Sequence, residues 1–592
     1  MKKAYSVAIT IFVVCSFTAG ISAQNILTLS IDSAKSTIKR EIYGALMENW
    51  GRDIYGGIYV GRSSAIPNTN GMRNDIIEGL KECGISTLEF PGGCFADEYH
   101  WKDGIGAVTA RPGGESKNGM GTDEYMQLCS LINAEPYLCA DLKNGTPAEM
   151  AEWIKYINEN TEHPEWHLKY LSMGNEPWGC GGDLSASAFA NQYAQFVASV
   201  PVTDGKPVVR VAGAGTWDPT WVNTVFDKNP GKCEGFSVHR YLVNDWTDHA
   251  GPSVNYSTLQ YHQIINLAYG VPDFINQFDD AMNKYDPDKK FGLMYNEWGA
   301  WYTEMPEQGY TFSQSTVRDA LIAAIHLNSF NNSCERVHMA CVAQPVNVIQ
   351  SIFLTDKNDQ SKMVKTPVFY TFKMFKVHQT AKKIPVTLQS ASFSQSVSGT
   401  SFNYPYLTAS ASLDSTGNIN ITISNTELAA AEELTVKLNG AEVYTSATGQ
   451  IITAADVKAF NDFGKAEQVN IQPFSNDNFT LSGKTLTVTV PSKCVILLTL
   501  TPESGTRVSG TLRTVKRDIT LSAVRQRVYV TFPGNSGTPA RLSLYGVDGR
   551  QIAVTTVAAR GMVSWQVPEV GNGMYIIRVE TDGFAMNKAV AF

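Results

Sequence analysis

Between about residue 41 and residue 345, short apolar runs alternate with longer amphipathic stretches. The apolar runs have the length of buried strands, and the stretches between them have the period of helices. The expected strands are Ile42–Met47, Ser86–Phe90, Pro136–Ala140, Lys169–Met173, Val208–Ala212, Gly235–Val238, Gly292–Tyr295 and Arg336–Cys341. The expected helices include Arg73–Cys83, Thr122–Asn133, Pro147–Asn158, Ala186–Val200 and Thr316–Phe330.

Alternation of strands and helices at this spacing implies parallel strands joined by right-handed crossovers. Eight such strands fit an α/β fold of the TIM (β/α)8 barrel type, which we place at residues 41–378. A doubly wound sheet is the alternative, but no Gly-rich phosphate loop follows any of the strands.

The pattern changes after about residue 385, where Thr, Ser and Val alternate without a long helical period. This alternation predicts an antiparallel, jelly-roll-like β-sandwich at residues 379–503. The runs that indicate strands are Tyr406–Leu413, Asn418–Ser424, Leu434–Leu438 and Thr485–Val490. A linker at residues 504–509 and a small C-terminal β-sandwich module at residues 510–592 follow.

The first 23 residues have the features of a secretory signal peptide. Lys2 and Lys3 precede an apolar run, and small residues lead to a cleavage site after Ala23. The run is shorter than the roughly 20 residues of a membrane-spanning helix. We therefore expect a secreted, cell-surface or periplasmic protein without a membrane span.

Charge and cysteine content exclude several classes of function. The net charge of −8 argues against nucleic acid as a partner. Nine scattered cysteines remain after cleavage, an odd number that does not form a disulfide framework, and most are expected to be buried. Because the chain has no Cys-x-x-Cys pair and no His-Glu-x-x-His helix, no zinc site is expected.

Polar residues gather where the expected barrel strands end, which is where TIM barrels place their chemistry. The fifth strand offers only Gly213 to Trp217. The other strand ends carry Glu48, Pro91-Gly92-Gly93-Cys94, Asp141, Asn175-Glu176, His239 and Tyr241, Asn296-Glu297, and Gln344 and Asn347.

Two of these residues are glutamates after the fourth and seventh strands, which face each other across the barrel mouth. Glu176 and Glu297 can therefore converge on one bond, as a retaining glycosidase requires of carboxyl groups about 5–5.5 Å apart. One carboxylate attacks the anomeric carbon and the other protonates the leaving oxygen. The alternative is that each glutamate pairs with an arginine or caps a loop. Sequence alone does not say which glutamate is the acid and which is the nucleophile.

Several motifs, in order over residues 40 to 375, resemble glycoside hydrolase family 51, which is dominated by α-L-arabinofuranosidases. They are Glu48-Asn49-Trp50-Gly51-Arg52, Ile54-Tyr55-Gly56-Gly57-Ile58-Tyr59, Phe90-Pro91-Gly92-Gly93, Tyr99-His100-Trp101-Lys102-Asp103, Gly174-Asn175-Glu176, Tyr295-Asn296-Glu297-Trp298, Trp301-Tyr302 and Ala343-Gln344-Pro345-Val346-Asn347-Val348.

The resemblance implies that Glu176 is the acid/base and Glu297 the nucleophile. The other residues that it places at the substrate are Glu48, Asn175, Tyr241 and Gln344 as ligands of the furanose hydroxyls, with His239, Cys94 and Trp178 beside them. It also implies an N-terminal segment at residues 24–40 whose strand, near Ile26–Ile31, joins the β-sandwich. Family members need no cofactor and are often homo-oligomers.

The chain departs from the family pattern at two positions. Many bacterial members have Asn where this chain has Cys94, and many have Asp where it has Asn296. Cys94 and Cys180 would both lie at the barrel mouth, and a disulfide between them is a hypothesis.

The last module resembles the C-terminal sorting domains of type IX-secreted proteins. The matching residues are Leu544-Tyr545-Gly546-Val547-Asp548-Gly549-Arg550 and Gly573-Met574-Tyr575-Ile576-Ile577-Arg578-Val579. A fibronectin-like spacer and a basic surface-attachment module are the alternatives. Residues 507–592 hold eleven Lys/Arg and five Asp/Glu, a net charge of +6 that favours contact with an acidic polysaccharide or the cell surface.

The expected function is the exo-acting release of terminal α-L-arabinofuranose from hemicellulose, as arabinoxylan, or from arabinan. An endo-β-1,4-glucanase or xylanase of the same clan is the first alternative. A non-catalytic carbohydrate-binding protein is the second, although a binder has no need of two carboxylates at this spacing.

Overall fold

The fold is described from a computed structural model, which covers residues 25–247, 249–303, 305 and 311–503. It also covers 520–524, 527–532, 539–546, 550–558, 561–568, 574–581 and 584–591. The chain divides into two units, Met1–Thr506 and Arg507–Phe592. The predicted signal peptide and the linker at residues 504–509 lie outside the described residues, so both stay predictions.

Eight parallel strands close into a barrel in the first unit, which confirms the predicted fold class. In barrel order they are β2 (Gly44–Leu46), β5 (Thr87–Phe90), β6 (Glu135–Ala140), β7 (Tyr170–Met173), β8 (Val209–Ala212), β9 (Gly235–Leu242), β10 (Gly292–Ala300) and β11 (Val337–Ala343). Each matches one of the eight expected strands. The inside is filled by side chains, including Tyr137, Met294 and Met339, so the barrel has a packed core and no pore.

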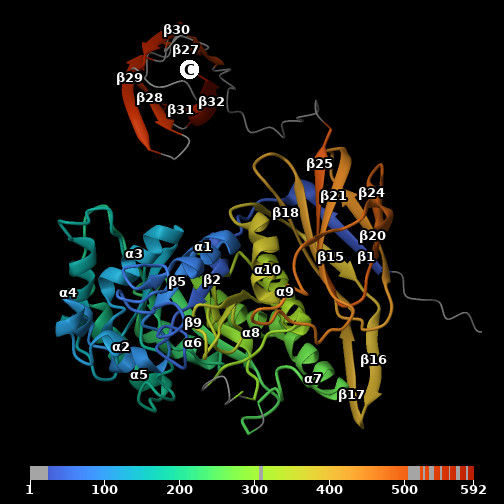
Figure 1. Ribbon diagram of the computed structural model, residues 1–592, viewed down its shortest axis with the longest axis horizontal. Coiled ribbons are helices and arrows are strands. Elements are labelled where there is room, and N and C mark those ends of the chain that lie inside the picture. Colours follow the sequence, from blue (N-terminus) through green and yellow to red (C-terminus); the bar gives the residue numbers. More distant parts are fainter. Residues whose placement is uncertain are drawn as a thin grey trace, which may run out of the picture. The chain divides into compact units, whose positions relative to one another are not determined.

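Helices cover the outside of the barrel (Figure 1). They are α1 (Asn74–Cys83), α2 (Glu115–Asn118), α3 (Thr122–Ile132), α4 (Pro147–Asn158), α5 (Ala186–Val197), α6 (Thr220–Lys228), α7 (Thr258–Ala268), α8 (Val271–Asn283), α9 (Val317–Asn332) and α10 (Pro367–Phe375). Local sequence sets their starts. The Thr146 hydroxyl caps α4 by accepting from the N–H of Glu149, and Pro147 occupies the first turn, where no hydrogen bond is lost.

Three strands, β9, β10 and β11, run further along the chain than the sequence predicted. β9 extends to Leu242 and β10 to Ala300, so His239, Tyr241 and Glu297 lie within strands and not beyond their ends. The pairing of β10 with β9 shifts register between Met294 and Glu297. Such a bulge re-aims a side chain while the strand continues, and here it separates the buried core residue Met294 from Glu297.

The β-sandwich consists of two sheets. One has the order β15 (Val386–Gln389), β1 (Asn25–Ser30), β20 (Glu432–Asn439), β24 (Thr485–Val490) and β23 (Phe479–Ser482). The other has the order β14 (Lys382–Ile384), β18 (Leu407–Leu413), β19 (Ile419–Asn425), β25 (Cys494–Pro502), β21 (Tyr444–Thr453) and β22 (Gln472–Pro473). The hairpin β16 (Ser392–Val397) and β17 (Thr400–Pro405) extends beside α7 (Figure 1).

One strand pair corrects the prediction of a wholly antiparallel sandwich. β1 pairs antiparallel with β15 but parallel with β20. A parallel pair needs a long connection between its strands, and the entire barrel lies in the chain between β1 and β20. The N-terminal strand thus completes the sandwich core with Leu27 and Leu29, both fully buried.

The second unit contains a three-stranded and a four-stranded sheet. Their orders are β26 (Thr520–Val524), β27 (Arg527–Phe532), β30 (Gly561–Gln566), and β29 (Gln551–Ala558), β28 (Pro539–Gly546), β31 (Met574–Thr581), β32 (Phe584–Ala591). Val528, Leu542, Ile577 and their neighbours form its own small core. Among the described residues of both units, no helix has the length and apolar character to cross a membrane.

Candidate active site

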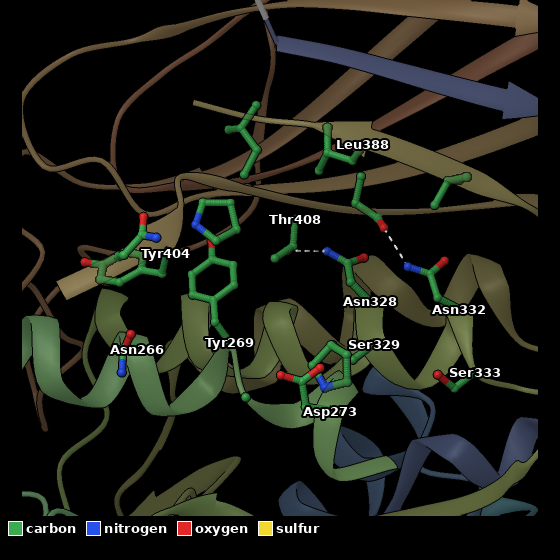
Figure 2. A pocket seen from close by; sticks show the side chains of 17 residues that line it. Asn266, Tyr269, Asp273, Asn328, Ser329, Asn332, Ser333, Leu388, Tyr404 and Thr408 are labelled. Carbon is green, nitrogen blue, oxygen red and sulfur yellow. Dashed lines mark hydrogen bonds between the residues drawn. The ribbon is translucent and has the colours of Figure 1, made fainter. Parts of the chain in front are cut away.

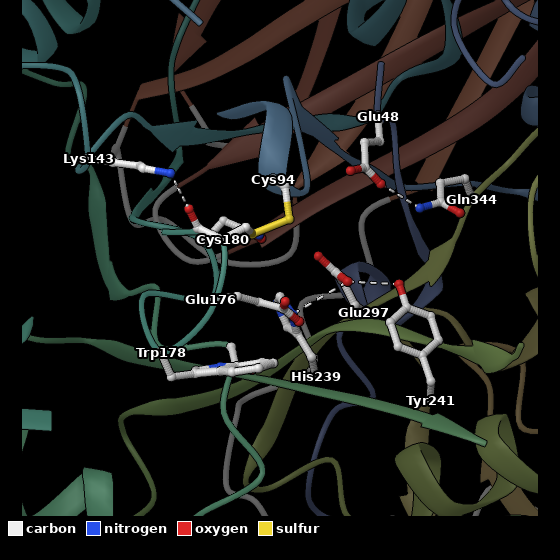
Figure 3. The surroundings of a disulfide bond; sticks show 12 residues. Glu48, Cys94, Lys143, Glu176, Trp178, Cys180, His239, Tyr241, Glu297 and Gln344 are labelled. Atoms are coloured by element: carbon white, nitrogen blue, oxygen red, sulfur yellow. Dashed lines mark hydrogen bonds and ion pairs between the residues drawn. A yellow bond between two sulfur atoms is a disulfide. The ribbon is translucent and has the colours of Figure 1, made fainter. Parts of the chain in front are cut away.

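The two glutamates singled out by the sequence meet at the barrel mouth (Figure 3). One carboxylate oxygen of Glu176, one of Glu297 and a ring nitrogen of His239 all lie within 4.8 Å of one another. A double-displacement glycosidase requires carboxyl groups about 5–5.5 Å apart, whereas an inverting enzyme needs roughly 6.5–9.5 Å for an intervening water. The arrangement therefore has the spacing for attack and protonation at one sugar carbon.

Glu176 lies on a tight loop that follows β7. Its φ of 41° is in the left-handed region, which a side-chain-bearing residue adopts at a cost. The loop holds this conformation because the Glu176 carbonyl accepts from the N–H groups of Gly179 and Gly181, at 2.8 and 3.1 Å. Of its side chain, 20% is exposed, so the carboxyl group can reach a bound substrate.

His239 lies between the two glutamates. Its Nδ1 is 2.8 Å from Oε1 of Glu176 and 3.4 Å from Oε2 of Glu297. Burial lowers the pKa of His239, although the charge of Glu297 opposes this shift. A neutral ring can accept a hydrogen bond at Nδ1 from protonated Glu176, with the ring proton then on Nε2.

Tyr241 supports Glu297 from β9. The Tyr241 hydroxyl donates to Oε2 of Glu297 at 2.7 Å. Burial raises the pKa of Glu297 well above its usual range, and the nearby Glu176 and Glu48 add to the effect, while His239 and Tyr241 oppose it. Two carboxyl groups that share one buried site hold a proton between them. The hydrogen bond from Tyr241 favours the charged form of Glu297.

Glu48 and Gln344 lie on the side of the site away from Trp178 in Figure 3. There, Nε2 of Gln344 donates to Oε2 of Glu48 at 2.7 Å. Burial raises the pKa of Glu48 to about 7, an effect that the Gln344 amide counters and the charge of Glu176 increases. The carboxylate lies against Gly93, whose φ is 55° and where a Cβ would collide with it. The Pro91-Gly92-Gly93 motif thus provides the space in which Glu48 sits.

Asp53 joins the loops that carry Glu48 and Gln344. Its two carboxylate oxygens accept from the backbone N–H groups of Glu48 and Val346, each at 2.9 Å. The sequence did not single out this residue, because an aspartate that binds only backbone has no motif of its own. Its complete burial beside the site indicates a role in holding the two loops together.

Several buried polar atoms at the mouth have no hydrogen-bond partner among the described residues. They are Oδ1 of Asn175, Nε2 of His239, Oδ1 of Asn296, Oε1 of Glu297 and Oε1 of Gln344. Such groups are rare in folded proteins, because each costs about 1–3 kcal/mol unless it is satisfied. A ligand with many hydroxyl groups would satisfy them.

Asn296, the residue before Glu297, donates to the buried carboxyl group of Glu89 on β5 at 3.0 and 3.3 Å. Burial raises the pKa of Glu89 to about 8. A neutral amide beside a carboxyl group of raised pKa avoids the repulsion that Asp at position 296 would create. Asn296, where many family members have Asp, is therefore compatible with the adjacent carboxyl group of Glu89.

Cys94 and Cys180 form a disulfide with a Cα–Cα distance of 5.6 Å, as hypothesised from the sequence. It joins the loops after β5 and β7 next to Glu176, and Lys143 donates to the Cys180 carbonyl at 2.8 Å. Cys94 therefore presents a disulfide sulfur close to Glu176 and no thiol. The other cysteines that the structure describes are buried and unpaired.

Thiol titration of the unfolded mature protein is expected to find seven free thiols without reductant and nine with it. The difference of two corresponds to the Cys94–Cys180 bond, with Cys83, Cys129, Cys139, Cys233, Cys334, Cys341 and Cys494 free. A Cys180→Ser variant should give eight thiols under both conditions. Nine thiols without reductant in the unaltered protein would disprove the bond.

Two clusters bring together potential metal ligands in the described part of the chain. In the first, Cys94, Glu176 and Cys180, the two sulfurs are bonded to each other and are not thiolates that could bind a metal. The second is Glu176, His239 and Glu297 itself. The hydrogen bond between His239 and Glu176, and the one from Tyr241 to Glu297, already account for this proximity.

A cavity of about 280 Å³ adjoins Glu176, His239 and Tyr241. Its remaining lining is Trp178, Trp217, Arg240 and Trp246. Trp178, expected near the substrate, is fixed by its indole N–H, which donates to the Gly215 carbonyl at 3.0 Å. The sequence did not single out Trp217 or Trp246 as site residues, since they follow strands in loops without a motif.

A larger cavity of about 570 Å³ lies elsewhere, between helices α7 to α9 and the β-sandwich (Figure 2). Amide and hydroxyl groups such as those of Asn266, Asn332 and Ser329 line it, and Asn328 bridges it by donating to Thr408 at 3.0 Å. Asp273 is its one carboxylate among the lining residues. Because it has no pair of acids, it is not a candidate for glycoside cleavage.

Comparison with known proteins agrees with this geometry. A family model described as "Alpha-L-arabinofuranosidase 1 domain" matches residues 79–252, and one described as "Alpha-L-arabinofuranosidase C-terminal domain" matches residues 296–493. The chain is 34% identical over 521 residues to the "Intracellular exo-alpha-L-arabinofuranosidase" of Bacteroides ovatus, covering 84% of this chain and 100% of the relative. It is 27% identical to a "Probable alpha-L-arabinofuranosidase C" of Aspergillus fumigatus, covering 76% and 94%.

A solved structure gives the same result. The family 51 arabinofuranosidase of Xanthomonas axonopodis pv. citri superposes with a TM-score of 0.76 at 30% identity, covering 81% of this chain and 100% of that one. The family expected from the motifs and the expected enzyme class are thereby confirmed. The chain belongs to glycoside hydrolase family 51 and is an α-L-arabinofuranosidase.

Proposed function

We propose that the enzyme releases terminal α-L-arabinofuranose by double displacement, with Glu297 as the nucleophile and Glu176 as the acid/base. The observation that carries this proposal is the approach of the two carboxyl groups, within 4.8 Å, beside a set of unpartnered polar atoms. The spacing fits the retaining mechanism, and the polar atoms fit a sugar with several hydroxyl groups.

In the first step, an oxygen of Glu297 attacks the anomeric carbon while Glu176 donates its proton to the departing oxygen. The glycosidic bond breaks, and an ester between the sugar and Glu297 forms. In the second step, the ionised Glu176 takes a proton from water, whose oxygen attacks the same carbon and releases Glu297. Arabinose leaves with its original configuration.

The proposed substrates are arabinoxylan and arabinan. The names of the relatives support α-L-arabinofuranoside chemistry and, for the Bacteroides ovatus protein, exo action. A product profile on arabinoxylan and debranched arabinan tests this, since exo action releases only monomeric arabinose. Release of oligosaccharides from the interior of either polymer, or activity on carboxymethylcellulose without activity on an aryl arabinofuranoside, would contradict it.

The pH dependence of kcat/KM should have an alkaline limb near pH 7. Burial raises the pKa of Glu176 to about 7. Because the protonated form donates to the leaving oxygen, activity falls as the pH rises through this pKa and the proton is lost. Initial rates between pH 4 and 9 on an alkyl arabinofuranoside, whose departure needs a proton, measure the limb. A profile that stays flat to pH 9 would contradict the assignment.

We also propose that the protein is exported. The predicted signal peptide supports this, as does the Cys94–Cys180 bond, since disulfides persist mainly in oxidising compartments. The name of the Bacteroides ovatus relative contains "intracellular", so cell fractionation is the necessary test. Recovery of the enzyme in the cytosol with its N-terminal residues intact would overturn the proposal.

For the C-terminal unit, we propose a role in sorting or surface attachment. Its separate core, its net charge of +6 and the residues that resemble sorting domains support this role. A chain that ends at Glu503 should keep its activity on an aryl arabinofuranoside but change its location in the cell.

A homo-oligomer is a further proposal, which light scattering of the purified protein tests.

A further inference from the structure

Two tryptophans at the barrel mouth are largely exposed to solvent. Trp217 is 57% exposed and Trp246 is 66% exposed. Among the residues whose side chains the structure describes, no other aromatic ring is as open to solvent. Leaving such rings in water sacrifices the burial energy that large aromatic side chains usually gain, so neighbouring exposed rings indicate a binding surface.

Both rings line the cavity that adjoins Glu176. Glu48 and Gln344 are absent from its lining, and in Figure 3 Trp178 lies on the opposite side of Glu176 from these two residues. The acid must face the oxygen that departs. A cavity on the side of the acid, away from the groups proposed to hold arabinose, is therefore the place for the rest of the substrate.

The two exposed rings are fixed in position by other aromatic side chains. Trp217 packs edge-on against Trp178, with ring centroids 4.4 Å apart. Trp246 packs edge-on against Trp301 at 5.8 Å, and Trp301 in turn contacts Tyr241 at 5.1 Å. Each exposed ring is thus connected to a residue next to a catalytic carboxyl group, so its place relative to the reaction centre is defined.

We propose that Trp217 and Trp246 bind the leaving group, and that this group is a neutral oligosaccharide with at least two pyranose rings. The inference rests on the proposed roles of Glu176 and Glu297. The flat, apolar C–H face of a pyranose matches the face of an indole ring. Two indoles, in the loops after β8 and β9, provide for two successive sugar rings. This favours a branched xylan backbone over a single sugar or an alcohol.

The test compares an arabinose-substituted xylo-oligosaccharide with 4-nitrophenyl α-L-arabinofuranoside. Trp217→Ala and Trp246→Ala should each lower kcat/KM on the oligosaccharide by about tenfold, and the double variant by more, since each lost stacking contact has an effect of this order. The loss on the aryl substrate should be smaller for both single variants, because its leaving group presents only one ring. Trp217→Phe and Trp246→Phe, which keep a ring, should recover most of the loss.

Xylotetraose provides a second readout, because it occupies the leaving-group site without being cleaved as an arabinoside. Its inhibition constant against the aryl substrate should rise in both Ala variants. The matched control is Val202→Ala, which removes an apolar side chain that is 98% exposed and precedes β8 at the other end of the barrel. This control should leave both rates and the inhibition constant unchanged.

The outcomes separate this inference from the proposed function. Wild-type enzyme without activity on the aryl arabinofuranoside would overturn the proposed function itself. An active wild type whose Ala variants cleave the oligosaccharide normally, or lose both substrates equally, would overturn only the assignment of Trp217 and Trp246. A selective loss on arabinan oligosaccharides, with xylo-oligosaccharides unaffected, would overturn the pyranose leaving group.

Discussion

Replacing Glu297 with alanine is expected to lower kcat by at least about 10⁴-fold on every arabinofuranoside. The variant lacks the oxygen that attacks the anomeric carbon, and the nearby carboxyl groups of Glu48 and Glu89 are held by Gln344 and Asn296. The loss should not depend on the leaving group, because the missing bond is to the sugar. Steady-state rates on aryl and alkyl arabinofuranosides measure it.

A second measurement on the same variant uses azide as an added nucleophile. In Glu297→Ala, azide can enter the space left by the carboxylate and attack the anomeric carbon directly, so the product is an arabinosyl azide of inverted configuration. The variant should fold well, since it removes a buried carboxyl group whose pKa is raised by its surroundings. A rescued product of retained configuration, in a variant with normal thermal unfolding, would show that Glu297 is not the nucleophile.

The barrel could be predicted from the sequence because its signals are local. Each strand is a short apolar run, and helix starts such as Thr146-Pro147 specify their own caps. The meeting of Glu176 and Glu297 was also predictable, since the barrel topology brings the ends of its fourth and seventh strands to one mouth. Periodicity and topology together thus predicted that the two glutamates meet.

Other features depend on packing between distant segments, which no local pattern reveals. The bulge near Glu297 results from the register of β10 against β9, and the parallel pairing of β1 with β20 joins strands more than 400 residues apart. The exposed ring of Trp246 has no motif, and its position depends on contact with Trp301. The disulfide could only be hypothesised, because two cysteines in loops have no defined distance until the loops are placed.

The loss of activity in Glu176→Ala is expected to depend on the leaving group. With an alkyl or sugar leaving group, kcat/KM should fall by about 10²- to 10⁴-fold, because the departing alkoxide must be protonated as the bond breaks. With a 4-nitrophenyl group, which leaves without a proton, kcat/KM should change little. The ratio must use kcat/KM, since kcat on the aryl substrate also includes the second step, in which Glu176 acts as a base.

The same variant tests the environment of Glu176. The alkaline limb near pH 7 should disappear from Glu176→Ala, although Glu48, whose pKa is also raised to about 7, remains in the pocket. Azide should restore kcat on the aryl substrate and give a product of retained configuration, because it attacks the ester on Glu297 from the side of the missing carboxyl group.

Equal losses on aryl and alkyl substrates, with the alkaline limb intact, would assign the proton donor to another residue. Glu48 would then be the group to examine, since burial raises its pKa to about 7 as well.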